Sequence, residues 1–207
     1  MNNQYYILDE EENQLGPFTF NEVIERDIDM HTQVLGNTNE WQYASELPEF
    51  NSYFQRKGIY FPTADNIAGI GWRILAFFID YILIVVITLI IALKFEWIKM
   101  PATGATTMPM PPMPYLLYLE LTVCFTYIFY HTVLEQTGWK GSIGKKICGL
   151  RVVDTNGEKL SLLKSAGRNL GAILSLNLYF IPFLTVLINE HKQAWYDRLT
   201  DAYIIKV

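Results

Sequence analysis

A run of twenty residues that is apolar apart from one acid constrains this chain more than any other feature. Residues 74–93 read ILAFFIDYILIVVITLIIAL, and the acid is Asp80. At about 1.5 Å per residue, such a helix is long enough to cross a hydrocarbon core about 30 Å thick. A charge near the middle of a span costs about 2.5–3.5 kcal/mol on insertion scales, so a partner or a function is expected for Asp80. Arg73 precedes it by two helical turns and shares its face.

Two further segments are apolar. Residues 115–134 predict a second span with tyrosines near both ends, where aromatic residues prefer the membrane interface. A third segment, at about 168–188, is interrupted by Asn177 and Pro182. The sequence predicts an α-helical integral membrane domain with full spans at about 72–93 and 115–134 and a third helical or re-entrant segment. If that segment bends back, the closing DAYIIKV can pair with GLRVVD at 149–154, and otherwise the C-terminus lies on the far side.

The region between the second and third segments contains a turn signal. Residues 154–157 read DTNG, and Asn-Gly provides the positive φ angles of a tight hairpin turn. The flanking CGLRVVD and EKLSL therefore predict a short cytoplasmic β-hairpin. The nearby GSIGKKICG predicts a tight turn with lysines on an anionic membrane surface.

The first fifty residues have a different pattern. Strand-like QYYILD, TQVLGN and EWQYA surround an amphipathic helix, FNEVIERDI, which a GPFT turn precedes. We expect a small α+β cytoplasmic domain at residues 1–52, a linker at 53–66 and the membrane domain at 67–207.

The charge distribution predicts the orientation. Residues 1–55 carry eleven acids and one base, whereas residues 140–168 carry seven lysines and arginines and residues 94–114 carry two. By the positive-inside rule, the N-terminal domain and the 135–168 loop face the cytoplasm and the Met/Pro loop faces outward. An acidic head of this kind excludes a nucleic-acid partner.

Polar residues recur along one face of the second and third segments as well. Glu120, Tyr127 and His131 share a face of the second segment, and Arg168, Ala172, Ser175 and Tyr179 share one in the third. The candidate polar interior comprises Arg73, Asp80, Glu120, His131 and Arg168. Two interpretations stay open: an ion pathway with Asp80 as the titrating site, or a structural set that fixes helix pairing by hydrogen bonds.

Catalytic and metal-binding motifs are missing from the sequence. No GxSxG, P-loop or HExxH motif is present, and the three histidines and two cysteines are scattered. We therefore expect neither an enzyme nor a bound metal or cofactor.

Three blocks of the chain resemble the RDD family of membrane proteins. These blocks are GWRILAFFIDYILI, GWKGSIGKKICGLRVVDTNGEKLSLLKSAGRNL and NEHKQAWYDRLTDAYIIKV. The resemblance implies that Arg73, Asp80 and Asp197 correspond to the arginine and two aspartates for which the family is named. It also implies a bacterial cytoplasmic (inner) membrane, with transport or an assembly role. Tyr196 stands where that family usually has histidine.

Residues 4–50 are similar to the second type of GYF-like domain. The GPF triplet at 16–18, Trp41 and the Ala44…Leu47-Pro48 ending carry the similarity, although the Gly-Tyr-Phe triplet itself is absent. The resemblance implies a surface for a protein or proline-rich peptide partner. The candidates for that surface are Tyr5, Tyr6, Gly16, Pro17, Phe18 and Trp41.

Two functional hypotheses follow from the sequence. In the first, the membrane domain handles an ion or small solute with Asp80 as the coupling carboxylate, and the small number of spans predicts a homo-oligomer in the lipid bilayer. In the second, the protein is a membrane scaffold or assembly factor whose N-terminal domain recruits a partner.

Overall fold

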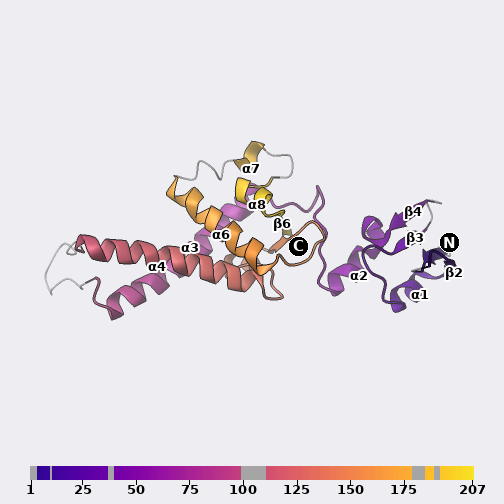
Figure 1. The fold of residues 1–207 in the computed structure, drawn as a ribbon, viewed down its shortest axis with the longest axis horizontal. Helices are drawn as coiled ribbons and strands as arrows, with labels where there is room; N and C mark the ends of the chain where they lie inside the picture. The colour runs from indigo at the N-terminus through magenta and orange to yellow at the C-terminus, as the bar shows by residue number, and fades with distance from the viewer. Residues whose placement is uncertain (1–3, 10, 37–39, 99–110, 179–184, 189–191) are drawn as a thin grey trace. The chain divides into compact units, whose positions relative to one another are not determined.

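The computed structural model describes residues 4–9, 11–36, 40–98, 111–178, 185–188 and 192–207. The chain divides into two compact units, and Figure 1 labels most of their elements. Unit 1 comprises residues 1–61 together with 156–158, and unit 2 comprises residues 62–155 and 159–207.

Unit 1 is built on an antiparallel sheet with the strand order β2-β1-β3-β4. The strands are β1 (Tyr5–Leu8), β2 (Gln14–Phe18), β3 (Gln33–Leu35) and β4 (Trp41–Tyr43), and the helices are α1 (Phe20–Glu25), two 3-10 turns (Ala44–Glu46 and Pro48–Phe50) and α2 (Asn51–Arg56). A small sheet-containing N-terminal region is therefore confirmed. Helix α1 begins after Thr19, whose hydroxyl accepts from the Glu22 N–H while the Glu22 carboxylate accepts from the Thr19 N–H.

The prediction of a turn at GPFT was wrong. Residues 16–18 lie within β2, and the chain reverses earlier, at residues 9–13. The Asp9 carboxylate stabilises that reversal, because it accepts from the backbone N–H groups of Glu11 and Asn13. Gly16 has a φ of 143°, and a Cβ there would approach the Tyr6 ring at 2.6 Å, so glycine is required within the strand.

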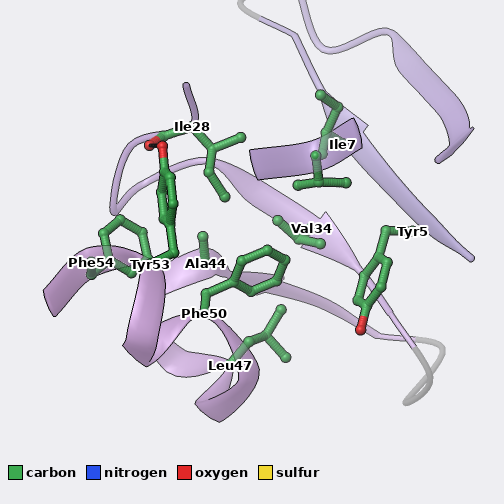
Figure 2. Close-up of a cluster of buried hydrophobic side chains, with 10 residues drawn as sticks. Tyr5, Ile7, Ile28, Val34, Ala44, Leu47, Phe50, Tyr53 and Phe54 are labelled. Carbon is green, nitrogen blue, oxygen red and sulfur yellow. Dashed lines mark hydrogen bonds between the residues drawn. The ribbon is translucent and has the colours of Figure 1, made fainter. Parts of the chain in front are cut away.

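The core of unit 1 extends past the predicted domain boundary. Figure 2 shows Phe50 in the middle of the buried cluster, with Val34 and Leu47 close to its ring. Tyr53 and Phe54 of α2 are buried in the same cluster. Because these two side chains complete the core, residues 53–61, assigned to the linker in the sequence, belong to unit 1.

Unit 2 contains two long apolar helices, as predicted. Its elements are α3 (Ile70–Lys94), α4 (Met113–Glu135), α5 (Ile143–Ile147), β5 (Leu150–Val153), α6 (Leu162–Asn177), α7 (Thr185–Ile188), α8 (Trp195–Leu199) and β6 (Tyr203–Lys206). Helices α3 and α4 are both long and apolar enough to cross a membrane, and only 22% and 11% of their most apolar windows are buried. A core helix of a soluble protein would be covered by its own fold, so the low burial favours lipid contact for α3 and α4.

Strand β5 pairs with β6, not with the segment that follows it. The two strands form an antiparallel sheet in which Leu150 faces Lys206 and Val153 faces Tyr203. The predicted hairpin with EKLSL was therefore wrong, since residues 158–161 are irregular and α6 begins at Leu162. The alternative pairing of the C-terminal strand is confirmed, and the intervening chain returns to the sheet that it left.

Candidate functional site

Asp80 lies at the centre of the contact between α3, α4 and α5. Its side chain is 1% exposed. Oδ1 accepts hydrogen bonds from the Tyr130 hydroxyl and the Gly144 backbone N–H, both at 2.7 Å, and Oδ2 accepts one from the Ser142 hydroxyl. One donor belongs to α4, one to α5 and one to the residue that caps α5. Asp80 of α3 therefore holds the N-terminus of α5 against both long helices.

The short helix α5 approaches α3 closely because residue 144 has no side chain. A Cβ on Gly144 would overlap the Ala76 carbonyl oxygen and come within 2.9 Å of the Asp80 carboxylate. Ser142 caps α5 by accepting from the Lys145 N–H while its own hydroxyl donates to Asp80. The sequence GSIG thus places a backbone donor and a hydroxyl donor on one carboxylate.

A chain of five buried charges lies beside Asp80. It runs from Arg73 through Asp197, Arg168 and Glu135 to Lys145. The Arg168 guanidinium contacts Asp197 at 2.8 Å and Glu135 at 2.6 Å, and so joins the two halves of the chain. Arg73 contacts the other oxygen of Asp197 at 3.3 Å. Each of these residues is less than 9% exposed, so the pairs are formed away from water.

Glu135 is the acidic centre of this network. It accepts from the Lys145 ammonium at 2.8 Å and also from Ser165 and Asn169. Burial, followed by the like charge of Arg168, lowers the pKa of Lys145 from its usual value, against the opposing effect of Glu135. A lysine held in this way depends on its carboxylate partner to remain charged.

A cavity of about 830 Å³ opens between α3, α4 and α6. Most of its wall is apolar, and polar groups border it in a few places. These groups include Arg73, Asp80, Glu120, His131, Lys145 and Arg168. His131 is 3% exposed and packs against the rings of Tyr127 and Tyr130.

The structure brings most of the predicted interior residues together. Arg73, Asp80, His131, Arg168 and Asp197 are all buried in unit 2. Glu120 differs, because it lies at an exposed position of α4 and meets the others only across the cavity. The third-segment face is confirmed for Arg168, Ala172 and Ser175, and Tyr179 lies outside the described residues.

Sequence reasoning missed three central residues: Glu135, Ser142 and Lys145. Glu135 follows the predicted span by one residue and so falls within the predicted polar loop. Its position four residues after His131 places both on one helical face, which was a usable signal. The expectation of lysines on a membrane surface was wrong for Lys145, since this side chain is buried against Glu135.

The residues proposed for peptide recognition in unit 1 do not form one exposed patch. Tyr5 is 2% exposed and packs edge-on against Phe50 in the core. Gly16, Pro17 and Trp41 are exposed, and Tyr6 and Phe18 are partly buried. The Phe18 ring is covered by the Arg26 guanidinium at 4.1 Å.

The comparison with protein families matches most of unit 2. A family model described as the RDD family matches residues 67–201. The uncharacterized protein YxaI of Bacillus subtilis (strain 168) is 32% identical over 133 residues, which cover 60% of this chain and 88% of that protein. No solved structure matches. The matched region contains Arg73, Asp80, Asp197 and the Glu135 network.

Proposed function

This chain belongs to the RDD family, and from that premise we propose that it moves an ion or small solute across a membrane with Asp80 as the coupling carboxylate. The proposal places unit 2 in a bacterial cytoplasmic membrane, with unit 1 on the cytoplasmic side. Two long apolar helices are few for a transport pathway, so we expect a homo-oligomer.

One observation carries the proposal: Asp80 has no basic partner, unlike the other buried acids among the described residues. Among the described residues, Glu135 and Asp197 each form salt bridges with two basic side chains, and Asp80 forms none. Its three donors are neutral groups. A carboxylate without a fixed cation can exchange a proton without breaking an ion pair.

The charged network supports a different role for the remaining residues. Arg73, Arg168 and Lys145 carry three positive charges against the two negative charges of Asp197 and Glu135. One net positive charge therefore lies beside Asp80, so a change of charge at Asp80 would be felt electrostatically by this network.

The test is ion-driven proton movement in sealed proteoliposomes. Asp80→Asn keeps the size of the side chain and one carbonyl acceptor for the Gly144 N–H, so we expect the fold to persist. We expect flux in the wild-type protein and a loss of about a hundredfold or more in Asp80→Asn, as for removal of a group essential to a proton-transfer step. Glu120→Gln is the matched control, since Glu120 borders the same cavity at an exposed position.

A second variant separates coupling from structure. Ser142→Ala removes one donor to Asp80 but leaves its carboxylate in place. If flux fails equally in Ser142→Ala and Asp80→Asn, Asp80 acts through the packing of α5 and the coupling role is wrong. Native mass measurement in the same lipid mixture tests the expected homo-oligomer, and monomers alone would count against a transport pathway.

The alternative is a membrane scaffold or assembly factor, which the hydrogen bonding of Asp80 also favours. Three donors from α4, α5 and its cap can serve purely to fix helix pairing. In this case unit 1 recruits a protein partner through its exposed aromatic residues, Trp41 and Tyr43. Absence of flux for every cation tested, together with capture of one partner by cross-linking at position 41 in native membranes, would favour the scaffold.

A further inference from the structure

We infer that the cavity between α3, α4 and α6 binds an amphipathic organic anion, with its acidic head at Arg73 and His131 and its hydrocarbon body along the apolar wall. This deepens the proposed function because it names the class of solute. The inference is tested by binding measurements and the proposed function by flux measurements. Failure of the binding experiment therefore does not decide whether the protein transports a solute, and failure of the flux experiment does not decide whether the cavity binds an anion.

The size and lining of the cavity suit such a ligand. Its volume, about 830 Å³, lies in the range of sites that hold drug-sized molecules, about 300–1,000 Å³. The wall is formed by Ile70, Phe77, Tyr81, Val123 and Leu176 together with small residues of α6. A hydrocarbon chain placed there would gain about 25 cal/mol for each Å² of apolar surface removed from water.

Buried nitrogen atoms without a hydrogen-bond partner border the cavity. Among the described side chains, Arg73 Nη2 and both ring nitrogens of His131 are buried without a hydrogen-bond partner. Arg73 is 6% exposed and His131 is 3% exposed, and both border the cavity. Leaving a buried donor unpaired costs about 1–3 kcal/mol, which a ligand carboxylate would recover by accepting from Arg73 Nη2 and from an N–H of the His131 imidazole.

The charges around the cavity favour an anion over a cation. Arg168 and Lys145 are already engaged by Glu135 and Asp197, whereas Arg73 keeps one nitrogen free. The oxygens of Asp80 are occupied by three donors. Glu120 precedes His131 by eleven residues on α4, about 16 Å at 1.5 Å per residue, so it lies far from the head group.

Three probes with the same chain length distinguish the head groups: dodecanoate, dodecanol and dodecyltrimethylammonium. Binding of each to the full chain in zwitterionic nanodiscs is measured by titration. Occupancy of the cavity is reported by Cys124, which borders it, through protection from a small maleimide. Cys148 is absent from the cavity lining and serves as the internal control.

The expected result is saturable binding of dodecanoate, with Cys124 protected and Cys148 unchanged. Dodecanol and the cationic probe should bind at least about tenfold more weakly, the size expected from one lost charge-assisted hydrogen bond. Equal binding of all three probes would overturn the inference, because the cavity would then accept any hydrocarbon chain. Absence of protection at Cys124 would overturn it as well.

Two variants link the binding to the named atoms. His131→Leu removes the unpaired nitrogens, so the ligand-free protein should unfold at the same or a higher temperature while dodecanoate affinity falls about tenfold. Arg73→Lys keeps a charge for Asp197 but lacks the free Nη2, and the same loss is expected. Unchanged dodecanoate affinity in both variants would exclude this head-group site.

Discussion

At the scale of single residues, the three buried carboxylates in the described part of unit 2 find their hydrogen-bond partners in different ways. Asp80 accepts from neutral donors, Asp197 accepts from two arginines and the Ala194 N–H, and Glu135 accepts from Arg168, Lys145 and two neutral side chains. Removing one member of a buried ion pair costs about 3–5 kcal/mol because the remaining charge loses its partner. Loss of Asp197 or Glu135 would therefore leave buried basic side chains without an ion-pair partner, whereas loss of Asp80 would not.

Gly144 provides a prediction at the same scale. Gly144→Ala would force its Cβ against the Ala76 carbonyl and the Asp80 carboxylate, and overpacking of this kind costs about 1–3 kcal/mol. We expect a lower midpoint of thermal unfolding for the full chain in detergent, measured by tryptophan fluorescence.

The matched control for that variant is Gly167→Ala. Gly167 lies in α6, and a Cβ added there would meet nothing within 4 Å beyond its chain neighbours and the backbone of its own helix. Alanine favours helices by about 1 kcal/mol over glycine, so the midpoint of this variant should stay the same or rise. A Gly144→Ala protein as stable as the wild type would show that α5 can move away from α3 without cost.

At the scale of secondary-structure elements, local patterns predicted the helices better than the pairing of strands. Helices α3 and α4 follow from continuous apolar composition, which depends on near neighbours in the sequence. Strand β5 pairs instead with residues about fifty positions later, and Asn156-Gly157 offered a nearer but incorrect partner. The charged network could not be predicted from the sequence, because it also depends on contacts between residues that are far apart in the chain. Glu135, Lys145 and Arg168 meet only after α4, α5 and α6 have packed.

The cap of helix α1 gives a prediction for unit 1. The pKa of Glu22 is lowered, first by the hydrogen bond from the Thr19 backbone N–H and then by the Thr19 hydroxyl. The pKa of Asp9 is lowered mainly by the Asn13 N–H, and that of Asp27 by its hydrogen bond with Lys57. A lowered folded-state pKa means stability that is present above the unfolded pKa, about 4, and is lost as the pH falls through the folded value.

Carbon-detected NMR titration of the side-chain carboxyls in the full chain measures these values directly. Glu22, Asp9 and Asp27 should titrate below their unfolded values, and their contributions to the stability of unit 1 should be lost on acidification. Thr19→Val removes the hydroxyl, so the pKa of Glu22 alone should rise towards its ordinary value. A Glu22 midpoint that does not respond to Thr19→Val would mean that the capping box is not formed in solution.

At the scale of the whole molecule, the sequence predicted an acidic sheet-containing head and a membrane body with two spans, and left the path of the third apolar segment open. The β5–β6 sheet resolves that path within unit 2, because a strand cannot pair with one on the opposite side of a bilayer. We therefore predict that the C-terminus lies on the same side of the membrane as the 137–161 region.

This return can be tested by single cysteines in a chain lacking Cys124 and Cys148. The three substitutions are Thr155→Cys, at a position before α6, Val207→Cys, directly after β6, and Glu96→Cys, just beyond the end of α3. We expect a membrane-impermeant maleimide to label positions 155 and 207 from one side of the membrane and position 96 from the other. By the excess of lysine and arginine around position 155, that shared side should be the cytoplasm. If position 207 instead is labelled from the side of position 96, residues 162–188 cross the bilayer. The β5–β6 pairing could not then form in the membrane, and Asp197 would be too far from Arg73 for their ion pair.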